Sequence, residues 1–191
     1  MAASGNDSLP SEPPPVPDAG PALPMAAPIV EAAWSPEFVA QALEVFCVCL
    51  GPEGLMHLRP VHAPSLRLPM GVEREPAELV LAAVARYDLA PIVVHSTSWR
   101  SEPGRVILSY VAAVEVPGSP SPFLAAEPVT RVELARGERT SAPASIAVRQ
   151  VLEHALRHLS WLVREDPAVR AALAAWRPSL EPYVPEPFQN L

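Results

Sequence analysis

Residues 68–91 read LPMGVEREPAELVLAAVARYDLAP, and this stretch organises the rest of the chain. Its first six residues, 68–73, form a loop punctuated by proline and glycine. Pro76 then favours the first turn of a helix, because the N–H that proline lacks is one that a helix start leaves unpaired. The stretch therefore predicts a loop followed by an amphipathic helix over residues 76–89, with apolar side chains at helical spacing at Ala77, Val80, Leu81, Val84 and Tyr87.

Apolar segments on both sides of this helix predict the strands of a sheet. Residues 43–50 read as a mostly buried strand, and the turn 51–54 leads back into a second strand at 55–59. After the helix, we expect strands over residues 91–97 and 105–116, joined by a turn at 101–104. The remaining elements expected in this half of the chain are a short helix over 35–41, a loop over 117–128 and a short strand over 129–134.

The clearest helical pattern lies near the C-terminus. Residues 145–164 carry one continuous apolar stripe, which predicts a long amphipathic helix. Asp166 followed by Pro167 predicts the start of a further short helix that ends near Trp176. Strands and helices in this order predict an α/β fold, an α/β/α sandwich with a mixed sheet between the helices.

Proline divides the chain into three parts. Residues 1–31 are rich in proline and alanine without an apolar period, which predicts a disordered tail. Its run of prolines at 13–17 offers a segment that a protein partner could bind. Residues 32–177 are expected to form the α/β domain, and residues 178–191 a proline- and aromatic-rich strap that packs on it.

Composition excludes several classes of function. The formal net charge is −7, which argues against a nucleic-acid partner. All 14 basic residues are arginine, so Schiff-base and P-loop chemistry are excluded. No stretch reaches the about 18 apolar residues of a membrane span, and no basic segment precedes an apolar one. We therefore expect a cytoplasmic protein, and the use of arginine and proline suggests a GC-rich bacterial source.

The order of the elements and the stretch 68–91 resemble the Nudix hydrolase family. Members carry a Leu-Pro-Gly-Gly loop, an acidic helix ending in Glu-Glu-x-Gly-Leu, and then strands. Here Leu68-Pro69-Met70-Gly71 stands for the loop and Tyr87-Asp88-Leu89 for the helix end. The resemblance covers residues 38–164 by layout and 66–91 by motif. It implies a Nudix-like fold and, for hydrolytic members, glutamates that hold divalent ions against a diphosphate.

The family's box, G-x5-E-x7-R-E-U-x-E-E-x-G-U, is degenerate in this chain. With Leu89 on its last apolar position, Ala82, Ala85 and Arg86 occupy glutamate positions. We therefore expect a non-hydrolytic domain that binds a small anionic ligand or a protein partner and needs no metal cofactor. The residues expected to bind the ligand are Arg67, Arg74, Arg86, Trp99 and Arg100.

Two other functions stay open at this point. One is a diverged Nudix-type hydrolase of a nucleoside diphosphate derivative, with Glu73, Glu75 and Glu78 as catalytic residues that hold magnesium. The other is a scaffold whose proline-rich tail recruits partner proteins. The sequence does not decide whether the protein is an enzyme.

A pair of histidines on the long helix offers a further candidate site. His154 and His158 are four residues apart, a spacing that can bind zinc when a third ligand is present. They lie on the polar side of the helix and its border, beside Glu153 and Arg157. We therefore expect a solvated helix face with a Glu–Arg pair rather than a metal site.

Overall fold

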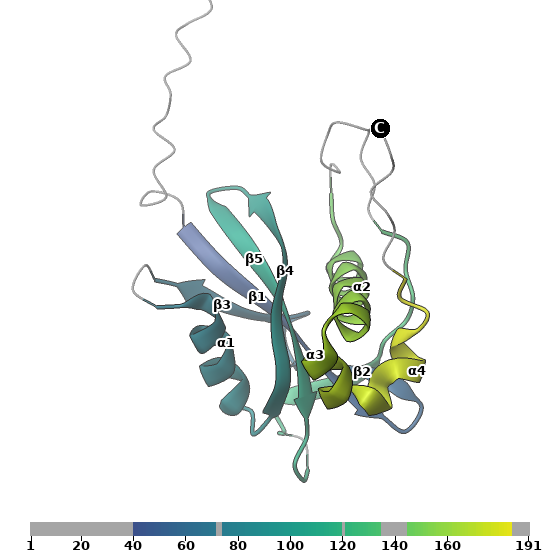
Figure 1. Cartoon of the computed structure of the whole chain (residues 1–191). Coiled ribbons are helices and arrows are strands. Elements are labelled where there is room, and N and C mark those ends of the chain that lie inside the picture. Colours follow the sequence, from purple (N-terminus) through teal and green to yellow (C-terminus); the bar gives the residue numbers. More distant parts are fainter. Residues whose placement is uncertain (1–39, 72–73, 120, 135–144, 185–191) are drawn as a thin grey trace, which may run out of the picture. The chain divides into compact units, whose positions relative to one another are not determined.

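The computed structural model describes residues 40–71, 74–119, 121–134 and 145–184. These residues form a six-stranded mixed sheet in the order β4-β5-β1-β2-β6, with β3 paired to β1. Strand β1 runs parallel to β5, and the other pairings are antiparallel. The strands are β1 Ala40–Gly51, β2 Gly54–Pro60, β3 Leu66–Met70, β4 Ala90–Glu102, β5 Arg105–Glu115 and β6 Leu124–Pro128 (Figure 1).

Helices lie on both faces of this sheet. Helix α1 (Pro76–Ala85) packs on one face, and α2 (Val148–Glu165) packs on the other. The short elements α3 (Pro167–Ala172), η1 (Ala174–Trp176) and α4 (Arg177–Leu180) follow α2 and add to its side of the core. The expected α/β/α sandwich with a mixed sheet is therefore confirmed. No helix within the described ranges is long and apolar enough to cross a membrane.

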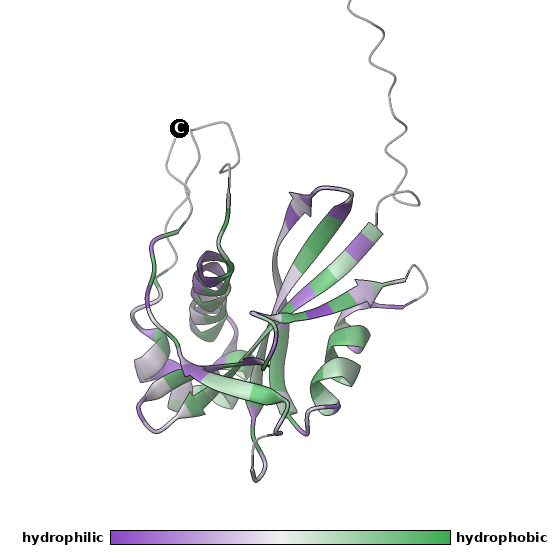
Figure 2. Ribbon diagram, turned by 180° about the vertical axis from the view of Figure 1, so that it is seen from behind, coloured by the Kyte–Doolittle hydropathy of each residue, from purple (hydrophilic) through white to green (hydrophobic). Residues whose placement is uncertain are grey.

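The central strand β1 supplies side chains to two separate cores. Alternate residues of a strand point to opposite faces of a sheet. Leu43, Val45 and Cys47 accordingly belong to the core under α1, whereas Phe46 and Val48 belong to the core under α2. All five are nearly or fully buried, which explains why most of this strand is apolar (Figure 2).

Two strands share one edge of β1. In β2, Leu58 lies opposite Cys47, and in β3, Leu68 lies opposite Leu43. The expected β1–β2 hairpin is confirmed, and Gly54 closes its turn with φ of 132°, a value that side chains rarely permit. The loop at residues 61–65 joins β2 to β3, so it sits where the two strands diverge along β1.

The long helix expected near the C-terminus is confirmed as α2. Asp166 caps the next helix as predicted, because its Oδ1 accepts hydrogen bonds from the backbone N–H groups of Ala168 and Val169. Leu180 and Tyr183 are buried in the same core as α2. The predicted tail, 1–31, and the last residues of the predicted strap, 185–191, lie outside the described residues.

Two strands occur where the sequence predicted loops. Strand β3 includes Pro69, and β6 ends at Pro128 while residues 129–134, predicted as a strand, are irregular. Each of these short strands pairs with one neighbour, β3 with β1 and β6 with β2. A strand with one paired edge tolerates proline, because the missing N–H can lie on the open edge. Pairing with a neighbour, and not local propensity, therefore defines both strands.

Three boundaries also differ from prediction. Residues 40 and 41 belong to β1 and not to a helix, because β5 and β3 pair with them. Strand β4 continues through residues predicted as a turn, to Glu102, and Gly104 with φ of 75° makes the turn. Helix α1 ends at Ala85, four residues early, and Asp88 adopts a left-handed φ of 57° that turns the chain into β4.

Candidate functional site

The arginines predicted to bind an anion lie on two faces of the sheet. Arg67 on β3 and Arg100 on β4 both contact Glu44 of β1 on the α2 face. Arg86 follows α1 and lines a cavity of about 590 Å³ together with Leu66, a residue of the core under α1. The structure thus brings Arg67 and Arg100 together but places Arg86 apart from them.

The other predicted site residues that the structure describes are exposed. Trp99 is 69% exposed on β4, next to Arg100. Arg74 precedes α1, Glu75 is its N-cap residue, and Glu78 lies in its first turn; all three are exposed. Glu73 lies outside the described residues. Glu75 and Glu78 therefore offer two solvated carboxylates at the start of α1.

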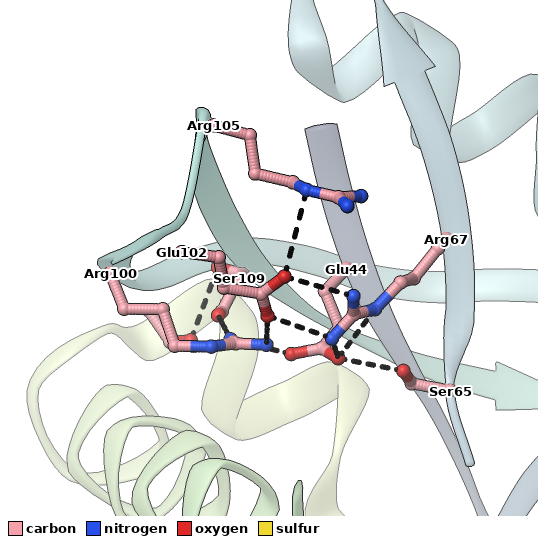
Figure 3. A network of polar contacts seen from close by, with 8 residues as sticks. Glu44, Ser65, Arg67, Arg100, Glu102, Arg105 and Ser109 are labelled. Carbon is pink, nitrogen blue, oxygen red and sulfur yellow. Dashed lines mark hydrogen bonds and ion pairs between the residues drawn. The ribbon is translucent and has the colours of Figure 1, made fainter. Parts of the chain in front are cut away.

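Glu44 lies at the centre of a cluster of charged side chains (Figure 3). Its side chain is fully buried, and its Oε1 accepts hydrogen bonds from Ser65 Oγ at 2.8 Å and from Arg67 Nε and Nη2 at 3.3 and 3.2 Å. Arg100 Nη1 lies 2.6 Å from Oε2 but outside hydrogen-bond angles. Oε2 is therefore held by charge and not by a directed hydrogen bond.

Glu102, at the end of β4, bridges the same two arginines. Its Oε1 accepts from Arg67 Nη2 at 3.0 Å and from Arg100 Nη2 at 3.2 Å, and Arg105 Nε lies 3.7 Å from its Oε2. Burial raises the pKa of Glu102, but the hydrogen bonds and charges of Arg67 and Arg100 outweigh burial and hold that pKa below its usual value. Glu102 is therefore held in its charged form.

The cluster joins four strands through paired charges. Buried charges are stable when each one is paired and hydrogen-bonded, as Glu44 is here. Arg67 donates to both glutamates through Nε, Nη1 and Nη2, whereas Arg100 donates to Glu102 through Nη2 and to Ser109 Oγ through Nη1 at 3.3 Å. The arrangement can hold β3, β1, β5 and β4 together, and it leaves few free donors for a ligand.

A second feature of the α2 face is a cavity of about 720 Å³ between the start of α2 and strands β2 and β6. This volume is typical of small-molecule sites. Partial positive charge gathers at the start of a helix, where backbone N–H groups lack helical partners. The basic residues of the cavity wall are His57, Arg59, His62 and Arg149, and the apolar ones include Val61, Val129, Val148 and Leu152.

Both carboxylates in this wall are already paired with arginine. The Arg59 guanidinium donates to Glu127, and this hydrogen bond is the main reason that the pKa of Glu127 is lowered. Burial opposes that shift, while the charges of Arg59, His57 and Arg149 add to it. These four side chains therefore act on one another across the cavity.

Glu153 is the other carboxylate, and it is 2% exposed. Its two carboxylate oxygens accept hydrogen bonds from Arg131 Nε at 3.0 and 3.2 Å. The carboxylate also accepts hydrogen bonds from Arg157 Nε at 3.1 Å and from the backbone N–H of Val132 at 3.3 Å. Its charge is therefore compensated from two sides. Arg149, by contrast, has no hydrogen bond or ion pair to any residue that the structure describes.

His57 is a buried imidazole in the same wall. It is 6% exposed, its ring lies 5.7 Å from that of Phe46, and its Nε2 has no hydrogen-bond partner among the described residues. Burial lowers the pKa of His57 to about 4, with Arg59 acting in the same direction and Glu127 and Glu44 opposing it. His57 is therefore neutral near pH 7.

The face of α2 expected to be solvated is largely buried, which corrects that prediction. The expected Glu–Arg pair is present, with Arg157 Nε 3.1 Å from Glu153 Oε1. The two side chains are nevertheless buried, since Glu153 is 2% and Arg157 is 9% exposed. His158 contacts His154 with ring centroids 4.6 Å apart and His95 of β4 at 6.0 Å. The sheet and the chain after β6 cover this side. Within the described ranges, no group of three or more His, Cys, Asp or Glu side chains could hold a metal ion.

Sequence reasoning did not identify the residues around the cavity. The basic residues of its wall come from β2, the following loop and α2, and they show no recognisable spacing in the sequence: His57, Arg59, His62 and Arg149. They come together only when α2 packs beside β2 in the fold. One signal was present for the charged cluster: Glu44 is the only charged residue in the apolar run 43–50. A charge in a strand buried on both faces indicates that partners must exist elsewhere in the chain.

Comparison with known proteins finds similarity among solved structures. No protein-family model matches the chain, and no curated protein matches it. Among solved structures, the chain is similar to the crystal structure of a MutT/nudix family protein from Enterococcus faecalis, with a TM-score of 0.46 and 12% sequence identity, over 71% of this chain and 67% of that chain. The similarity concerns the arrangement of strands and helices, and no site residue is taken from it.

Proposed function

We propose that this domain binds a small anionic ligand in the cavity at the start of α2 and does not hydrolyse it. The observation that carries the proposal is the basic wall of that cavity, in which both carboxylates are ion-paired while Arg149 has no partner among the described residues. An anion there would meet a guanidinium able to form forked hydrogen bonds, close to the positive end of α2.

The charges of the cavity support an anion over a cation. Arg59 neutralises Glu127, and Glu153 is paired with Arg131 and Arg157. Arg149 then adds a further positive charge. The apolar part of the wall gives a ligand with a carbon skeleton a surface to pack against.

A hydrolytic role would need carboxylates that hold magnesium against a diphosphate. Glu75 and Glu78 are exposed at the start of α1, and neither lines the cavity. Glu44 and Glu102, the acidic residues of the charged cluster, are each held by two arginines. These residues do not fit a magnesium site.

Calorimetric titration of the full chain with inorganic pyrophosphate tests the proposal. We expect binding without added metal, and Arg149→Ala should weaken it about tenfold or more, because a charge-assisted hydrogen bond is lost. Arg164→Ala, which removes the same charge near the other end of α2, is the matched control and should bind as the wild type does.

Two results would count against this assignment. Weaker binding in Arg86→Ala, with wild-type binding in Arg149→Ala, would move the site to the α1 face. Magnesium-dependent turnover of nucleoside diphosphate derivatives that is lost in Glu75→Gln or Glu78→Gln would establish the diverged hydrolase instead.

A further inference from the structure

The cavity holds a titratable group that the proposed function leaves unused. His57 comes from the middle of β2, and its buried ring forms part of the wall that also contains Arg59 and Arg149. Its Nε2 is shielded from solvent and unpartnered within the described part of the chain. A buried polar atom without a partner is uncommon in a folded protein and calls for an explanation.

We propose that the cavity selects a dianionic oxyanion, such as a phosphate ester, and that His57 takes up one proton when the dianion binds. This inference rests on the proposed function, because it concerns the same cavity. It adds the charge class of the ligand and a dependence of affinity on pH.

The physical reason is the balance of charges around the ring. In the empty cavity burial disfavours the imidazolium, which agrees with the lowered pKa of His57. A dianion brings two negative charges into a site partly shielded from water, where Coulomb attraction exceeds that in bulk water. The imidazolium then becomes the favoured form, and the proton comes from solvent.

A monoanion supplies half of this attraction. It would meet Arg149 and the start of α2 but would compensate less of the cost of charging a buried ring. Selectivity for a dianion therefore follows from the same residue that takes up the proton. The charged and titratable groups that face His57 from the surrounding segments are Glu44 of β1, Arg59 of β2, His62 of the following loop, Glu127 of β6, and Arg149 and Glu153 of α2.

Sulfate is a suitable probe because it stays a dianion throughout the neutral range, so a proton taken up on binding must go to the protein. Calorimetric titration of the full chain with sulfate, in buffers of different ionisation enthalpy, measures that uptake. We expect it to approach one proton per sulfate, and the affinity to rise up to about tenfold for each pH unit between about pH 8 and pH 6. Formate, a monoanion, should bind at least about tenfold more weakly.

Substitutions identify the residue that takes up the proton. His57→Gln, or His57→Asn if the first does not fold, should abolish the uptake, with folding checked by circular dichroism. His158→Gln is the matched control, because burial also lowers the pKa of His158 but this residue does not line the cavity, and the variant should keep the uptake.

The possible failures are distinguishable. Sulfate that binds without proton uptake, or formate that binds equally well, would overturn this inference and leave the proposed function intact. Uptake lost in His158→Gln, or kept in His57→Gln, would overturn the assignment to His57. Absence of binding by sulfate, phosphate and pyrophosphate alike would remove the proposed function itself.

Discussion

Glu44 shows how one side chain can constrain a whole sheet. It is the only charged residue in the buried run of β1, and its two oxygens contact groups from β3, β4 and the loop before β3. Removing one partner of a buried ion pair costs far more than the pair gains, because the remaining charge is left uncompensated in a poorly solvated site. The carboxylate therefore matters more for holding strands together than for binding.

The first prediction concerns this residue. Glu44→Gln should destabilise the protein by about 3 to 5 kcal/mol, because the buried site would lose its negative charge and Arg67 and Arg100 would keep only Glu102 as a charged partner. Urea unfolding followed by circular dichroism measures the change. Glu102→Gln is the control: Glu102 is partly exposed at a strand end, so its loss should cost less. Equal costs in the two variants would show that burial of Glu44 is not the decisive factor.

At the scale of elements, α2 organises one half of the molecule. Its buried face carries Leu152, Leu156 and Leu159, which pack against Phe46 and Val111 in the core on that side of the sheet. Its first turn borders the cavity that we propose as the binding site. The packing of these leucines therefore also fixes the position of Arg149, because Arg149 lies in the first turn of the same helix.

The second prediction concerns this packing. Leu159 is fully buried, so Leu159→Ala should cost about 2 to 5 kcal/mol through lost contacts and a residual cavity. Leu81→Ala on α1 is the matched control, since Leu81 is 43% exposed and the same change should cost well under about 1 kcal/mol there. Thermal melts of both variants provide the comparison. A small loss for Leu159→Ala would mean that α2 packs loosely on the sheet.

At the scale of the whole molecule, several histidines are buried or half-buried in neutral form. Burial lowers the pKa of His57 to about 4, and burial together with the neighbouring His154 and His95 lowers the pKa of His158 to about 4. Both values lie below the 6.5 of an unperturbed histidine. Between about pH 6.5 and pH 4 the unfolded chain therefore binds more protons than the folded protein.

The third prediction follows from that difference. The free energy of unfolding should be greatest above about pH 6.5 and should fall as the pH drops toward about 4, since protons favour the unfolded state throughout this window. Replacing one of these groups, as in His158→Gln, should make the fall shallower, and His62→Gln, at an exposed position, should not. Urea unfolding at a series of pH values measures both slopes. A slope in His158→Gln equal to that of the wild type would contradict the buried neutral form.

Elements whose signals are local can be predicted from the sequence. The apolar stripe of residues 145–164, the proline at the start of α1, the glycine turn after β1 and the Asp166 cap each act through neighbouring residues, and all four are observed. The α/β/α order followed from these elements. Strands β3 and β6 could not be found in the same way, because their sequences contain proline and are defined by pairing with β1 and β2.

The candidate site was decided by the tertiary structure alone. Arg67 and Arg100 were singled out as ligand-binding residues, but the sequence could not show that Glu44 and Glu102 neutralise them, since these groups come from four separate segments. The cavity likewise depends on β2, β6 and α2 meeting in space. Local propensity acts over a few residues, whereas burial, charge pairing and the shape of a cavity depend on groups that are distant in sequence, and only folding brings those groups together.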